Sequence, residues 1–62
     1  MYKVTLTNQA EVLFPSFDRA ITHMKGQIYV SVPNRYVSEV VECGNIFRST
    51  YGFNECTMEK VS

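Results

Sequence analysis

The short length of the chain is the feature that most limits its fold. A domain of about 60 residues buries only about 60% of the surface that its unfolded chain exposes, and this chain has 62 residues. It can therefore build one small core, and we expect a single domain over residues 1–62. Apolar residues make up 45% of the sequence and no low-complexity run interrupts it, so we expect the chain to fold.

The first half of the chain predicts a hairpin followed by a helix. Residues 2–7 alternate apolar and polar side chains, the period of a half-buried strand, and residues 10–14 predict a return strand that Pro15 ends. Ser16 then stands where an N-cap belongs. After it, apolar side chains recur every three or four residues over 17–25, which predicts a helix with one buried face.

The second half predicts strands around a second helix. Residues 27–32 alternate again and predict a strand, whereas 34–44 show a helical apolar face. A strand over 36–43 that turns into the next segment is the alternative, because three valines lower helix propensity. Residues 46–53 predict a strand, and the polar tail 54–62 predicts an edge strand or a frayed end.

These segments place the chain in the α+β class. We expect one antiparallel sheet of three to five strands, with one or two helices packed on one face, in the order β-β-α-β-α-β. The other face of the sheet is then left to solvent or to a partner.

The balance of charge argues against nucleic acid as the partner. Six Lys and Arg residues face six Asp and Glu residues, so the general attraction to phosphate backbones is missing. No stretch approaches the roughly 18 apolar residues of a membrane span, and the first residues lack the apolar region of a signal peptide. We therefore expect a cytoplasmic protein without membrane contact, in which Cys43 and Cys56 stay as thiols.

No group of residues predicts catalysis. His23 is the only histidine, and Cys43 and Cys56 lack the Cys-x-x-Cys spacing of structural zinc sites. The three glycines are isolated and cannot form a phosphate-binding loop. We expect no enzymatic activity, no cofactor and no metal site.

Tyrosines and arginines of the second half are the candidate binding residues, because both types are enriched in interface hot spots. Tyr29 points away from the apolar face of its predicted strand. The predicted partner-binding residues are Tyr29, Arg35, Tyr36, Glu39, Arg48 and Tyr51. Two alternatives stay open: solvated tyrosines on a sheet surface, and a sheet on which Tyr29, Phe47 and Tyr51 stack unpaired bases of RNA.

The run Ile21-Thr22-x-Met24-Lys25, on a helix preceded by a strand with Lys3-Val4 and followed by another strand, carries a resemblance. In these residues, in length and in element order over 2–42, the chain resembles the small Dmd antitoxins of T-even-type bacteriophages. Proteins of that family bind and block a host endoribonuclease toxin. The resemblance implies a phage-encoded inhibitor in the host cytoplasm that covers a ribonuclease toxin. Another phage anti-defence inhibitor is the alternative function. Separately, the small core and the uncovered sheet face allow a homodimer, which would bury that face.

Overall fold

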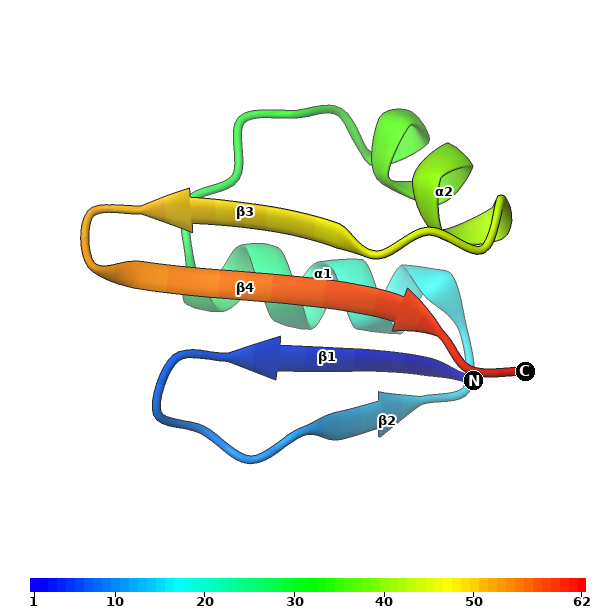
Figure 1. The fold of residues 1–62 in the computed structure, drawn as a ribbon, viewed down its shortest axis with the longest axis horizontal. Helices are drawn as coiled ribbons and strands as arrows, with labels where there is room; N and C mark the ends of the chain where they lie inside the picture. The colour runs from blue at the N-terminus through cyan, green and yellow to red at the C-terminus, as the bar shows by residue number, and fades with distance from the viewer.

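A single four-stranded sheet carries two helices in the computed structural model, which covers residues 1–62 (Figure 1). The elements are β1 (Tyr2–Leu6), β2 (Val12–Phe14), α1 (Phe17–Gln27), α2 (Asn34–Glu42), β3 (Phe47–Tyr51) and β4 (Asn54–Lys60). All neighbouring strands are antiparallel, and their order in the sheet is β2-β1-β4-β3. The predicted α+β class is confirmed.

The two ends of the chain form the centre of the sheet. β1 pairs with β4 along its whole length, from Tyr2 opposite Lys60 to Leu6 opposite Cys56. The two termini consequently meet at one end of the molecule, where the Val61 N–H donates to the Met1 carbonyl at 2.9 Å (Figure 1). β2 and β3 are the two edges of the sheet.

The predicted strand over 27–32 is wrong, and the element order is β-β-α-α-β-β. These residues end α1 and then cross to α2 in an extended connection. Ile28 and Val30 are buried in this connection, whereas Tyr29 is exposed. The period-two pattern therefore records an extended backbone laid across the core, which needs no strand partner to bury alternate side chains.

The tail is neither frayed nor an edge, because residues 54–60 form the central strand β4. Cys56 and Met58 are fully buried, and they alternate with Glu55, Thr57 and Glu59. Glu55, Thr57 and Glu59 lie on the sheet face that carries no helix, so this face of the central strand is polar.

Local signals set the ends of the helices. The Ser16 hydroxyl accepts a hydrogen bond from the Arg19 N–H at 3.3 Å, which confirms the predicted N-cap of α1. The helix over 34–42 is also confirmed against the strand alternative. After it, Gly44 has φ +86° and its N–H donates to the Val41 carbonyl at 3.1 Å, a helix ending that favours glycine.

The core lies between the sheet and the helices. Its side chains come from both helices, from the 28–33 connection and from three strands: Val4, Leu6, Ala20, Ile21, Met24, Ile28, Val30, Val37, Val41, Phe47, Cys56 and Met58. None of these is charged, and no buried side-chain polar atom lacks a hydrogen-bond partner. Burial of these side chains is the main source of stability in so small a domain.

Candidate protein-docking surface

A shallow groove lies between the outer side of β3 and helix α2. Its volume is about 360 Å³, and it is open to solvent. Five of its seven lining residues are apolar or aromatic. The lining consists of Val32, Tyr36, Val40, Ile46, Phe47, Arg48 and Ser49.

Exposed apolar side chains line this groove and recur at the far end of β3. Five of the eight large apolar side chains that the chain exposes belong to this region: Tyr36 and Ile46 line the groove, whereas Tyr29, Tyr51 and Phe53 lie at the other end of β3. Each is more than half exposed, and Phe53 is completely so. We call the groove together with these five residues the α2–β3 surface. A concentration of this kind is typical of protein-binding sites, since single exposed apolar residues are normally scattered.

Neighbouring rings hold the tyrosines of the α2–β3 surface in place. Tyr29 from the connection packs against Tyr51 of β3, with 5.4 Å between the ring centroids. Tyr36 of α2 lies edge-to-face on Phe47, with centroids 6.4 Å apart and planes at 77°. Both distances lie in the range of favourable aromatic pairs. Less side-chain entropy is then lost when a partner binds.

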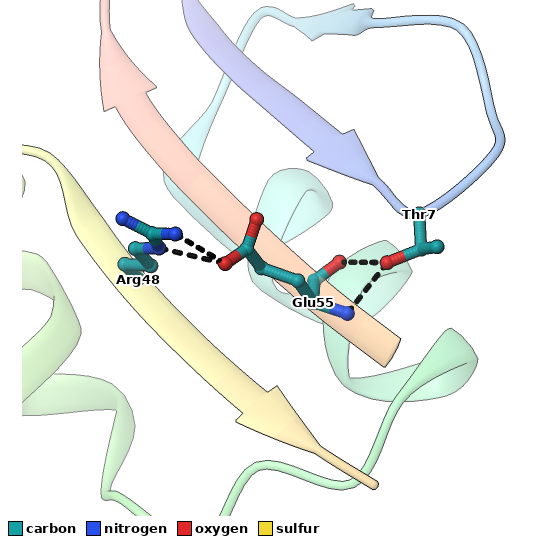
Figure 2. Close-up of polar contacts among 3 residues, drawn as sticks. All are labelled: Thr7, Arg48 and Glu55. Carbon is teal, nitrogen blue, oxygen red and sulfur yellow. Dashed lines mark hydrogen bonds and ion pairs between the residues drawn. The ribbon is translucent and has the colours of Figure 1, made fainter. Parts of the chain in front are cut away.

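The outer edge of β3 has backbone groups without partners in the chain. The Thr7 N–H donates to the Glu55 carbonyl at 3.1 Å. The Thr7 hydroxyl donates to the same carbonyl and accepts from the Glu55 N–H, so the Glu55 backbone points toward β1 (Figure 2). In an antiparallel sheet the direction alternates along a strand. Asn54, Cys56 and Met58 therefore bond to β3, and the backbone groups of Arg48 and Thr50 point outward.

The geometry of the β3–β4 hairpin turn also indicates that the backbone groups of Arg48 and Thr50 point away from β4. Gly52 and Phe53 connect β3 to β4, and the flanking residues Tyr51 and Asn54 form the closing pair. Gly52 has φ +64° whereas the φ of Phe53 is negative, as in a type II′ turn with glycine in first position. No backbone hydrogen bond joins the 28–33 connection to β3.

The charged residues near the groove form ion pairs. Arg48 Nη2 lies 2.6 Å from Glu55 Oε2, on the helix-free face of the sheet (Figure 2). Arg35 Nε lies 3.9 Å from Glu39 Oε1 on the outer side of α2. All four side chains are well exposed, so each pair contributes little to stability. The α2–β3 surface is thus apolar with a neutral polar rim, like many protein interfaces.

The structure brings the six predicted binding residues together in pairs. Tyr29 meets Tyr51, Tyr36 and Arg48 line the same groove, and Arg35 pairs with Glu39 on the outside of the helix. Sequence reasoning missed Val32, Val40, Ile46 and Phe53. Gly52 was the available signal for Phe53, because a Gly-X pair between two strands marks a hairpin turn, where side chains are exposed.

The arrangement does not assemble the base-stacking sheet. Tyr29 lies outside every strand, and Phe47 is buried on the helix side. The helix-free face presents no aromatic side chain from the strands; its residues are Lys3, Thr5, Leu13, Arg48, Thr50, Glu55, Thr57 and Glu59. On this face Lys3 Nζ lies 3.3 Å from Glu59 Oε1 and 3.6 Å from Glu11 Oε2. The hydrogen bond to Glu59, and then the charge of Glu11, raise the pKa of Lys3.

Glu42 fixes the end of α2 to the centre of the sheet. Its carboxylate accepts a 2.5 Å hydrogen bond from the Tyr2 hydroxyl and a 2.7 Å hydrogen bond from the Lys60 ammonium. The bond from Lys60, then that from Tyr2, lowers the pKa of Glu42. The same carboxylate raises the pKa values of Tyr2 and Lys60. This contact holds α2, one wall of the groove, in position.

The remaining reactive groups do not form a second site. Cys43 is an exposed thiol and Cys56 a buried one, and burial raises the pKa of the Cys56 thiol. No cluster of three or more His, Cys, Asp or Glu side chains is arranged to hold a metal ion. Neither helix has the length and apolar character needed to cross a membrane.

Comparison with protein-family models, with curated proteins and with solved structures finds no match to this chain. Inferences about its function therefore rest on the geometry of the α2–β3 surface and on the residues quoted above.

Proposed function

We propose that this chain is a small protein-binding inhibitor that docks through the α2–β3 surface and blocks its partner sterically. The observation that carries the proposal is a set of five exposed apolar side chains along one edge of the molecule, two of them lining an apolar groove and three at the other end of β3. Burying such a cluster against a partner removes apolar area from water, which is the main driving force of association.

The α2–β3 surface has the parts of an energetic hot spot. Tyr29, Tyr36 and Tyr51 offer large rings that already rest on neighbours. Arg48 is one of the residues that line the groove while its guanidinium pairs with Glu55 on the helix-free face, and Arg35 lies on the exposed side of α2. Tyr and Arg anchors of this kind dominate the binding energy of many protein interfaces, while the surrounding contacts exclude water. Zero formal net charge favours a protein partner over nucleic acid.

The finer proposal is that the partner is a bacterial endoribonuclease toxin. It rests on the resemblance of the Ile21–Lys25 run and of the element order to phage antitoxins. In this proposal the edge of β3, helix α2 and the tyrosines cover the RNA-binding or active site of the toxin. Another nuclease of host defence is the alternative partner, and identifying the bound protein separates the two.

Affinity capture from bacterial lysate, with and without nuclease treatment, followed by an RNA-cleavage assay on the retained protein, tests the proposal. We expect one stoichiometric protein that survives nuclease treatment and whose activity this chain inhibits. If only RNA is retained and nuclease treatment removes it, the proposal fails. A retained protein whose activity this chain does not inhibit would support binding but contradict the proposed inhibition.

A further inference from the structure

We propose that two copies of this chain pair through their β3 strands and so join their sheets into one continuous eight-stranded sheet. The inference starts from the free edge of β3 and does not depend on the inhibitor function. It identifies a second copy as the occupant of the α2–β3 surface in the free protein.

The backbone of β3 permits this pairing. Arg48 and Thr50 point their backbone groups outward, as derived from the Glu55 carbonyl and the Gly52–Phe53 turn. In an antiparallel arrangement with its two-fold axis at Ser49, Arg48 lies opposite Thr50 of the second copy. These are the two residues whose N–H and C=O groups are free, so each exchanges hydrogen bonds with the other.

The charges along this edge are complementary to themselves. Within one copy Thr50 is paired with Glu55 on the helix-free face. The two-fold pairing therefore places three residues in one row across three neighbouring strands. Arg48 of the first copy is followed by Thr50 on β3 of the second copy and by Glu55 on its β4. The long Arg48 side chain can bridge its own Glu55 and that of the second copy. No two like charges lie directly opposite each other, so the cross-strand repulsion that would destabilise the pairing is absent.

The apolar parts are complementary as well. The groove lies at the Phe47 end of β3, and the exposed Tyr29–Tyr51 pair lies at the other end. Antiparallel pairing about Ser49 sets Phe47 opposite Tyr51 of the second copy. The tyrosine pair of each copy thus meets the groove of the other. The isologous arrangement of a two-fold dimer requires this self-complementarity.

Self-pairing gives the exposed edge a function. A flat strand edge with free backbone groups and apolar flanks promotes uncontrolled association unless something covers it. A second copy covers it in a closed dimer. Partner binding and self-pairing use the same surface, so a partner protein must displace the second copy.

Two opposite substitutions at Thr50 test the proposal by analytical ultracentrifugation over a range of protein concentrations. Thr50→Lys places a cation opposite Arg48 of the second copy, and we expect the dimer dissociation constant to rise about tenfold or more. Thr50→Glu places an anion there, and we expect the dimer to tighten severalfold. Thr5→Lys, on the same face but on the central strand β1, is the matched control and should leave dimerisation unchanged.

The same variants separate association from folding. Within one copy, Thr50→Lys stands opposite Glu55 and should stabilise the fold, whereas Thr50→Glu should destabilise it. Each substitution at Thr50 should thus change the stability of the fold and the stability of the dimer in opposite directions. A wild-type protein that stays at 7.1 kDa up to about millimolar concentration, the range of weak association, would overturn the proposal. A dimer that Thr50→Lys and Thr5→Lys leave equally intact would also overturn it.

Discussion

Glu42 is the one residue of α2 whose side chain makes polar contacts with the central strands of the sheet. Only Val37 and Val41 of α2 are fully buried, so this nine-residue helix has a narrow apolar anchor. The carboxylate of Glu42 adds contacts to Tyr2 of β1 and Lys60 of β4. The position of α2, and with it the shape of the groove, therefore depends on the ionisation of exposed groups.

Glu42→Gln should lower the free energy of unfolding near neutral pH, and the loss should depend on pH. The pKa of Glu42 is lowered from 4.5 in the folded state, so its contribution is present above about pH 4.5 and disappears as the pH falls through the folded value. The pKa values of Tyr2 and Lys60 are raised from 10.0 and 10.5, so their contribution is present below these values and disappears as the pH rises through the folded ones.

Urea unfolding at a series of pH values measures this difference. We expect the wild type and Glu42→Gln to converge in acid and to approach each other again in strong base. A difference that stays constant across the whole range would show that the ion-paired contact does not stabilise α2.

The two cysteines offer a second check at the scale of single residues. Cys43 follows α2 and is exposed, whereas Cys56 lies in the core with a raised pKa. Because the thiolate is the reactive form, a neutral thiol reagent should label Cys43 rapidly and Cys56 only after unfolding. Mass spectrometry of the labelled chain should find one modification in the native protein and two in denaturant. Rapid labelling of both would contradict the burial of β4.

At the scale of elements, sequence periodicity predicted which side chains are buried more accurately than it predicted which segments pair as strands. The helix after Ser16 and the strand of residues 2–6 followed from local patterns and a cap. The segment 27–32 did not, because its alternation of buried Ile28 and Val30 with exposed Tyr29 is the same in a strand and in an extended connection. Only the positions of the other strands distinguish the two, and those depend on contacts far apart in sequence.

The central position of β4 also escaped prediction for a physical reason. Strands that pair between the two ends of a chain are joined by no turn, so no local residue signals them. The polar side chains of Glu55, Thr57 and Glu59 resembled a solvated tail. An antiparallel sheet with one bare face allows this composition even in its middle strand.

Alanine substitutions at two glycines near helix ends should change the free energy of unfolding in opposite directions. Gly26 lies within α1, and a Cβ there would meet no atom within 4 Å. Gly26→Ala should therefore stabilise the protein by about 0.5–1 kcal/mol, since alanine loses less backbone entropy in a helix. Gly44 has φ +86°, and Gly44→Ala should destabilise by about 1–2 kcal/mol.

Chemical denaturation of both glycine variants gives these free energies directly. Equal signs for the two substitutions would contradict either the end of α1 or the left-handed ending of α2. The pair is informative because the chemical change is the same and only the backbone conformation differs.

At the scale of the whole molecule, the sheet has two unlike edges. The β2 edge is short, with three residues, and Val12 and Leu13 are exposed there. The β3 edge is longer and has the groove, the paired tyrosines and the free backbone groups of Arg48 and Thr50. The tyrosines of this surface were proposed from residue type, because the composition of a hot spot is visible in sequence. The groove could not be predicted without the fold, since Val40 and Ile46 line one groove only when α2 lies beside β3.

Capture with surface variants tests whether this chain binds another protein through the α2–β3 surface. Wild type, Arg35→Ala, Tyr36→Ala and the helix-free-face control Thr57→Ala, each checked for unchanged thermal unfolding, are used for capture from nuclease-treated bacterial lysate. We predict that wild type and Thr57→Ala retain the same stoichiometric protein, and that Tyr36→Ala and Arg35→Ala lose most of it. Equal retention by all four chains, or loss only with Thr57→Ala, would show that the α2–β3 surface is not the binding site.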